Sequence, residues 1–131
     1  MSKNPSQITV FRGWPKGGYA RSPFVTKLEL RLRLAGVPYN TDVGSPFKGP
    51  KRKIPYVDVW LKEGASERLG DSALITKRLI ELDQLEDLNG AISQEQSALD
   101  LALRALVEDR MYFYVVSDYE FAKAFFLSKP I

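Results

Sequence analysis

Apolar and polar residues recur along the first third of the chain with two different periods. Residues 8–12 alternate apolar and polar side chains, which predicts a short strand. A Gly- and Pro-rich loop follows. From residue 23 to 35 the apolar residues recur at helical spacing, and Gly36 is a suitable stop because glycine tolerates the left-handed conformation. Residues 37–43 then predict a second strand, so strand, helix and strand form a βαβ unit whose two strands we expect to be parallel.

The next part of the chain predicts a hairpin and a helix. Residues 44–53, GSPFKGPKRK, are too rich in Pro, Gly and Lys for a regular element. Residues 54–61 alternate again, and after a turn around Gly64 residues 68–70 predict a return strand that pairs antiparallel. A helix over residues 71–82 follows, with Asp71 as its cap. Its apolar residues that we expect in the core are Leu74, Ile75 and Leu79.

The remaining residues predict a linker and a helical part. Residues 83–93 are polar and acidic, and Ser93 with Gln96 has the pattern of a capping box at the start of a long helix. One helix on a small domain cannot bury the aromatic residues of the last stretch, and such a surface is typical of an interface or an apolar ligand site. These residues are Tyr112, Phe113, Tyr114, Tyr119, Phe121, Phe125 and Phe126.

Composition narrows the chemistry. The 131 residues suffice for one domain or a small domain with a few added helices, and 44% hydrophobic content is normal for a globular protein. The sequence has no cysteine and no histidine, which excludes disulfides, thiolate or histidine metal sites and a Ser-His-Asp triad. We expect no metal. No apolar run is long enough for a bilayer span or a secretory signal, so we expect a cytoplasmic protein without stable membrane insertion.

Charge is divided unevenly along the chain. Residues 1–53 carry eleven basic and two acidic residues, a balance of +9, whereas residues 54–131 carry eight basic and fourteen acidic residues, a balance of −6. A basic half can attract nucleic acid, anionic lipid or a small carboxylate, or it can simply be a solvated face. The acidic second half, and the lack of aromatic residues clustered among the cations, argue against nucleic acid or an anionic membrane as a partner.

Three short motifs stand in order along this βαβ-ββα pattern: SPF at the start of the first helix, KIP before the third strand, and DS at the start of the next helix. In this arrangement the chain resembles the thioredoxin-fold half of glutathione transferases over residues 8–82. Within that family, the sequence of these segments is most similar to the failed-axon-connections and metaxin-like branch. The resemblance implies an α/β fold with a thioredoxin-like, glutathione-binding domain over residues 1–82, a linker over 83–93, and a truncated all-α part over 94–131.

Ser22 is the candidate catalytic residue. As an N-cap its hydroxyl can accept a backbone N–H, and Pro23 suits the first helical position, so capping alone explains the pair. The same helix start also favours an anion. The resemblance implies that Ser22 stabilises the glutathione thiolate and lowers its pKa. Tyr19 is a rival for this role, because some transferases use a tyrosine after the first strand.

The remaining candidates bind glutathione. The resemblance implies a cis bond before Pro55, with the backbone of Ile54 pairing with the cysteinyl unit, and Lys53 meeting the glycyl carboxylate. A proline at a strand start and a solvated basic loop are the structural alternatives. The resemblance also implies that Ser72 holds the γ-glutamyl carboxylate and Asp71 the ammonium group, although Asp71 is equally suited to cap its helix.

The function that follows from the resemblance is a glutathione-dependent transferase, or an isomerase or peroxidase of the same logic. Glutathione would be the co-substrate, its thiol would attack a small hydrophobic electrophile, and the protein would be a homodimer. The alternative is a non-catalytic transferase-like module that dimerises or docks on a partner through its aromatic C-terminal tail.

Overall fold

The structure is a computed structural model that describes residues 7–61 and 63–127, with side chains for all of these except 121, 122 and 124–127. The chain divides into two compact units whose boundary lies between Asp87 and Leu88, within the residues expected as a linker. Residues just before the boundary belong with the first unit because Leu85 is buried in its core.

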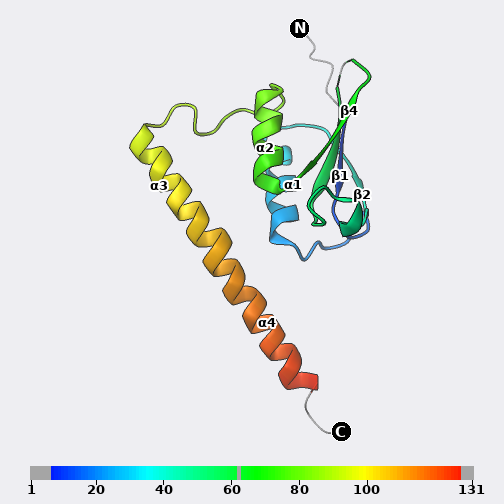
Figure 1. The fold of residues 1–131 in the computed structure, drawn as a ribbon, viewed down its shortest axis with the longest axis vertical. Coiled ribbons are helices and arrows are strands. Elements are labelled where there is room, and N and C mark those ends of the chain that lie inside the picture. Colours follow the sequence, from blue (N-terminus) through cyan, green and yellow to red (C-terminus); the bar gives the residue numbers. More distant parts are fainter. Residues whose placement is uncertain (1–6, 62, 128–131) are drawn as a thin grey trace. The chain divides into compact units, whose positions relative to one another are not determined.

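A four-stranded mixed sheet forms the centre of the first unit (Figure 1). Its strands are β1 (Gln7–Phe11), β2 (Asn40–Asp42), β3 (Tyr56–Trp60) and β4 (Ser66–Gly70), in the spatial order β2-β1-β3-β4. β1 and β2 are parallel, whereas β3 pairs antiparallel with both β1 and β4. The predicted βαβ unit and the predicted hairpin are therefore confirmed.

The strands β2 and β4 do not start at the residues that the sequence predicts. β2 starts at Asn40 rather than at residue 37, because the amides of Gly36 and Val37 still bond to carbonyls of the preceding helix and Pro38 has no N–H to donate. β4 starts at Ser66 rather than at residue 68, because the turn closes tightly enough for Ser66 to pair directly with Trp60.

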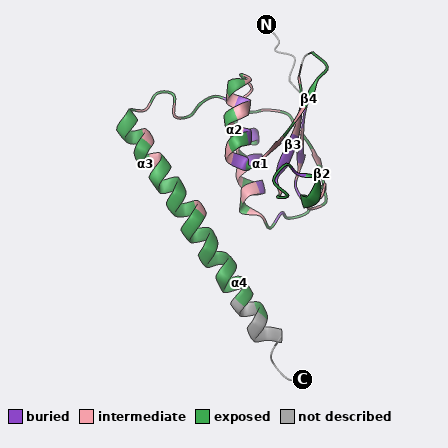
Figure 2. Ribbon diagram, viewed as in Figure 1, coloured by how far each residue is buried: buried purple, intermediate pink, exposed green. Residues whose placement is uncertain are grey.

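Helices α1 (Pro23–Leu34) and α2 (Ser72–Glu81) pack on one face of the sheet (Figure 1). Every second residue of β1 and β3 faces the helices, and the apolar stripes of α1 and α2 face the sheet. Together they form one apolar core, which Figure 2 shows in purple between the helices and the sheet. On the opposite face lies the loop with the short 3-10 helix η1 (Pro46–Lys48). The core residues are Ile8, Val10, Leu28, Leu32, Val57, Val59, Ile75, Leu79 and Leu85.

The expected core position of Leu74 is wrong. Ile75 and Leu79 are fully buried, but the Leu74 side chain is 48% exposed. On α2 the face toward the sheet is set by Ser72, Ile75 and Leu79, which follow one another by three and four residues. Leu74 lies about a quarter turn from Ile75 and so leaves this face.

An ion pair between Arg12 and Glu29 joins the end of β1 to α1. The guanidinium nitrogen lies 3.2 Å from the carboxylate, and the two side chains are only 9% and 8% exposed. Arg12 also donates to the carbonyl oxygens of Pro15 and Gly18, at 3.0 and 3.1 Å. One buried cation therefore holds both α1 and the loop that leads into it.

The second unit is helical. α3 (Gln94–Ala105) continues through a π-helical turn, η2 (Leu106–Met111), into α4 (Tyr112–Leu127). The predicted capping box is present, with the Ser93 hydroxyl accepting from Gln96 and the Gln96 side chain accepting from Ser93. No helix of the described ranges is long and apolar enough to cross a membrane.

None of the described side chains of the second unit is buried (Figure 2). The exposure expected for the aromatic tail is observed for Tyr112, Phe113, Tyr114 and Tyr119, which are 41–64% exposed. The side chains of Phe121, Phe125 and Phe126 and the expected helical residues 128–131 lie outside the described residues.

Replacing Leu32 by alanine should lower the free energy of unfolding by about 2–5 kcal/mol, because it removes a fully buried side chain and leaves a cavity. Urea denaturation of the whole chain measures the effect. Leu34→Ala is the matched control, since Leu34 is 76% exposed on the same helix and should change stability by less than about 0.5 kcal/mol. Equal losses in the two variants would contradict the assigned core.

Glu29→Leu should destabilise the first unit by about 3–5 kcal/mol, because it leaves the Arg12 cation buried without its carboxylate. Adding Arg12→Met should recover part of this loss, since no uncompensated charge then remains. Denaturation of the two single variants and the double variant completes the cycle. Strictly additive losses would show that the pair is not coupled.

Candidate active site

The candidate site lies at one end of the sheet, which the strand register defines. Phe11, Tyr56 and Gly70 stand in one row across β1, β3 and β4. At this row the chain leaves β1 toward α1, enters β3, and leaves β4 toward α2 (Figure 1). The start of α1, the segment before β3 and the start of α2 therefore meet at one end of the sheet, and these are the segments that carry all six predicted site residues.

Two stacked aromatic rings stabilise this end of the sheet, on the face opposite the helices. The rings of Phe11 and Tyr56 stack with centroids 4.5 Å apart, and the Arg68 guanidinium lies 5.2–5.3 Å from both. Arg68 donates to both carboxylate oxygens of Asp58, at 2.7 and 2.8 Å, and this bonding raises the pKa of its guanidinium above the usual value. Arg68 remains a cation clamped over the rings.

Ser22 is the N-cap of α1. Its hydroxyl oxygen accepts from the amide of Val25 over a long 3.5 Å, and its carbonyl accepts from Thr26. The side chain is half-buried, and no described residue accepts its hydroxyl proton. Ser22 therefore caps α1 as the sequence predicted, and its O–H remains free to donate a hydrogen bond.

The segment before β3 packs closely at the same sheet end. The Ile54–Pro55 peptide bond is cis, the conformation that the family resemblance implied. The Ile54 side chain lies beside Gly13, where an added Cβ would be 3.5 Å away. Pro55 is buried. Outside helices and strands, no hydrogen bond between described residues uses the amide or the carbonyl of Ile54.

Residues 46–53, which we call the basic loop, also reach the start of α2. Pro50 packs against Gly70, where an added Cβ would be 3.3 Å from the proline ring. The Lys51 ammonium lies 3.8 Å from the Asp71 carboxylate. Lys53, the lysine singled out from the sequence, is exposed and forms no ion pair with a carboxylate of the described residues. Sequence reasoning missed Lys51, since nothing in a run of cations marks the one that turns toward α2.

Asp71 and Ser72 open α2 in an unusual conformation. Asp71 has a φ of +71°, in the left-handed region, and its carboxylate accepts from the amide of Ala73 at 3.0 Å. Ser72 is buried, and its carbonyl accepts from the Thr76 hydroxyl at 2.9 Å. The cap that the sequence allowed is thus formed, while the Asp71 side chain stays 44% exposed and open to a further partner.

Tyr19 lies on the loop between β1 and α1. It is 84% exposed and borders a cavity of about 360 Å³ beside α1, which none of the six predicted site residues lines. The polar side chains at this cavity are Arg12, Tyr19, Thr26, Glu29 and Arg33. A hydrogen bond to the Tyr39 hydroxyl raises the pKa of Arg33 there.

Within residues 7–61 and 63–127 no cluster of three or more Asp or Glu side chains could hold a metal ion. The polar groups available at the sheet end are the Ser22 hydroxyl, the Ile54 backbone, the amides at the start of α2, one carboxylate and the basic loop. Such a set suits an extended peptide with charged ends and a sulfur or another anion near α1.

Comparison with known protein families gives a match over most of the chain. Residues 23–120 match the family model described as glutathione S-transferase N-terminal domain. The match begins one residue after Ser22, includes the segment before β3 and the start of α2, and continues into the helical unit. No curated protein and no solved structure matches the chain.

The mixed sheet with two helices on one face is a thioredoxin-like α/β domain, followed by a helical region. The matched residues cover well over half of the sequence. The chain therefore belongs to the glutathione S-transferase N-terminal domain family.

Proposed function

We propose that the first unit binds glutathione at the sheet end and activates its thiol for attack on a hydrophobic electrophile. The observation that carries this proposal is the shared register of Phe11, Tyr56 and Gly70, which gathers two helix starts and an unused backbone amide and carbonyl at one end. An extended tripeptide can pair with that backbone like one more strand.

Each end of glutathione has a complementary group. The γ-glutamyl carboxylate would accept hydrogen bonds from the hydroxyl and the amide of Ser72, at the start of α2, where the helix dipole favours an anion. Its ammonium group would pair with Asp71, displacing Lys51, whose ammonium lies 3.8 Å away in the free protein. Lys53, which no described carboxylate neutralises, would meet the glycyl carboxylate.

The thiol would lie at the start of α1. The Ser22 hydroxyl, free to donate, would hydrogen-bond the sulfur, and a hydrogen bond to the charged form lowers the pKa of the thiol. The thiol proton passes to solvent when the thiolate forms. The thiolate then attacks an electrophilic carbon of the second substrate: a C–S bond forms, the bond from that carbon to its leaving group breaks, and the leaving group departs with the bonding electron pair. Tyr19 stays the rival donor, on the exposed loop before Ser22.

Ser22→Ala should leave glutathione affinity nearly unchanged and raise the pKa of the bound thiol by roughly 1–2 units, because a charge-assisted hydrogen bond of about 1.5–3 kcal/mol is lost. The fraction of thiolate at neutral pH therefore falls. Titration calorimetry gives the affinity, and thiolate ultraviolet absorbance against pH gives the pKa. Tyr19→Phe tests the rival, and a pKa that rises only in that variant would exclude Ser22.

Two further variants separate binding from capping. Ser72→Ala with Asp71→Asn should abolish binding of glutathione at millimolar concentration. Ser93→Ala is the matched control, since it also removes a helix N-cap, at about 1 kcal/mol, but on α3. If the unsubstituted chain does not bind glutathione at millimolar concentration, the proposal is wrong.

A second candidate function rests on the exposed side chains of the helical unit. Met111, Phe113 and Tyr114 are 58–64% exposed. A transferase-like module without catalysis, as in the metaxin-like and failed-axon-connections branch, would use this surface to form a homodimer or to dock on a partner. The cytoplasmic location expected from the sequence stays a prediction.

If the helical unit self-associates, sedimentation velocity should show a mass that rises with concentration, and Phe113→Glu should return the chain to a monomer. Lys123→Glu, a charge change at an exposed position of α4, is the control and should leave association intact. Association together with undetectable glutathione binding would favour this second function, and a monomer at all concentrations would exclude self-association.

A further inference from the structure

Cations and one aromatic ring share the loop that leads to β3. This is the basic loop, residues 46–53. Phe47 is 81% exposed, although it is a fully apolar side chain. The cations beside it, all exposed, are Lys48, Lys51, Arg52 and Lys53.

Internal hydrogen bonds hold the basic loop in shape. The amide of Gly49 donates to Pro46 at 3.2 Å, and the amide of Arg52 donates to Gly49 at 3.0 Å. On the sheet side, Gly49 is buried against Tyr56. The exposed side chains are therefore presented from an ordered backbone, which lowers the entropy cost of binding.

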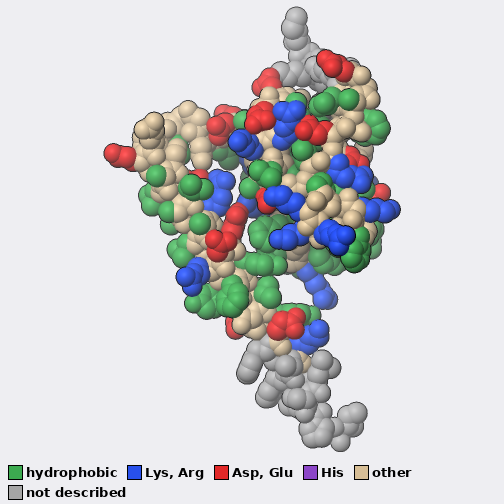
Figure 3. Space-filling view, viewed as in Figure 1, with side chains coloured by type: hydrophobic (Ala, Val, Ile, Leu, Met, Phe, Trp, Pro, Cys, Tyr) green, Lys and Arg blue, Asp and Glu red, His purple; other side chains and the backbone are tan. Residues whose placement is uncertain are grey.

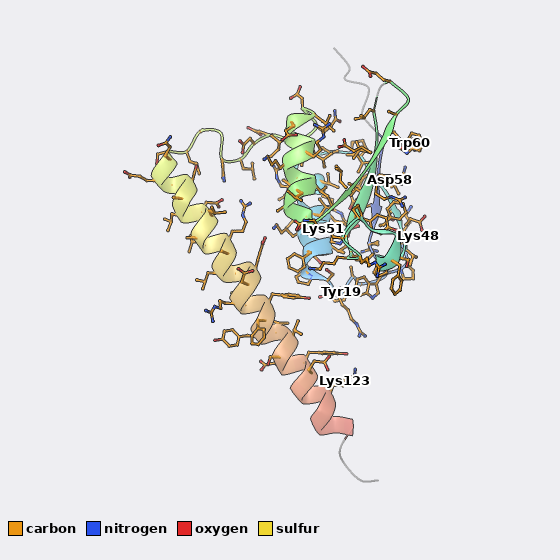
Figure 4. The ribbon with its side chains drawn as sticks, viewed as in Figure 1. Tyr19, Lys48, Lys51, Asp58, Trp60 and Lys123 are labelled. Atoms are coloured by element: carbon orange, nitrogen blue, oxygen red, sulfur yellow. The ribbon has the colours of Figure 1, made fainter. Side chains whose placement is uncertain are left out.

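The charge of the basic loop is largely uncompensated. In the described part of the chain, Asp71 is the carboxylate that pairs with this loop, through Lys51 at 3.8 Å. Among the described residues, no carboxylate forms an ion pair with Lys48, Arg52 or Lys53. Basic side chains gather on this face of the first unit in Figure 3, and Figure 4 marks Lys48 and Lys51 on the loop.

We propose that the basic loop docks the protein on the surface of an anionic lipid bilayer, with Phe47 entering the headgroup region and the cations contacting lipid phosphates and carboxylates. Peripheral binding of this kind takes two contributions, apolar insertion and attraction to anionic lipid, and the loop supplies both. No helix needs to span the bilayer.

A bilayer fits the loop better than a nucleic acid does. Single-stranded nucleic acid is bound in grooves where cations follow the backbone and several aromatic rings stack on bases. Here the cations form a compact cluster around one projecting ring. From the sequence we expected neither nucleic acid nor an anionic membrane as a partner, because aromatic residues do not cluster among the cations. The structure changes this expectation for the membrane, because Phe47 is an exposed ring on the same loop as the cations. The two proposals share Lys51 and Lys53, but the residues that the test replaces, Phe47, Lys48 and Arg52, have no part in the proposed glutathione site.

The test measures binding of the whole chain to phosphatidylcholine vesicles with and without phosphatidylserine, by co-sedimentation at two salt concentrations. Binding is expected only with the anionic lipid and should weaken as salt rises. Lys48→Ala and Arg52→Asn should each weaken it about fivefold. Asparagine is chosen because Arg52 has a φ of +52°. Lys77→Ala, an exposed lysine on α2, is the control.

Phe47 separates membrane docking from general attraction to polyanions. Phe47→Ala should weaken vesicle binding severalfold and leave binding to heparin unchanged, with Leu34→Ala as the control for loss of an exposed apolar side chain. Phe47→Trp should show blue-shifted emission, quenched by brominated lipid, above the signal of the two native tryptophans. No vesicle binding, or vesicle binding that Phe47→Ala leaves intact, would overturn the proposal.

Discussion

The alignment of three strand ends in one row is the constraint on which the rest of the molecule depends. Phe11, Tyr56 and Gly70 pair across the sheet, so the chain turns off β1, onto β3 and off β4 at the same level. A shift of one residue in either pairing would move every side chain of that strand to the other face. Both the apolar core and the meeting of the helix starts would then be lost together.

The two faces of the sheet are stabilised by different means. On the helix side, apolar side chains interlock and a buried pair, Arg12 with Glu29, ties the loop after β1 to α1. On the other side, stacked aromatic rings under Arg68 support an irregular loop instead of a helix. The candidate site is flanked by both. The buried ion pair holds the loop that leads to Ser22, and the stacked rings support the loop that leads to Ile54 and Pro55.

Local features of the sequence predicted most of the fold. Alternation in β1 and β3, the caps at Ser22 and Asp71, and the capping box after the linker all depend on neighbours a few residues away. Leu74 and Glu29 were not predictable in this way, because their exposure and burial depend on which face of each helix the sheet covers. The candidate site came from family resemblance, and the contact of Lys51 with Asp71 is a long-range result of folding.

Two glycines of the loop before β3 lie where the chain leaves no room for a side chain. An added Cβ at Gly44 would lie 2.7 Å from the Tyr56 hydroxyl, and one at Gly49 would lie 2.8 Å from the carbonyl of Lys53. Because no side chain fits at these two positions, the loop approaches Tyr56 and its own backbone there without side chains. Only a backbone free of Cβ atoms at both places lets the chain pass this close to the sheet, so Gly44 and Gly49 set how near the whole segment before β3 can lie.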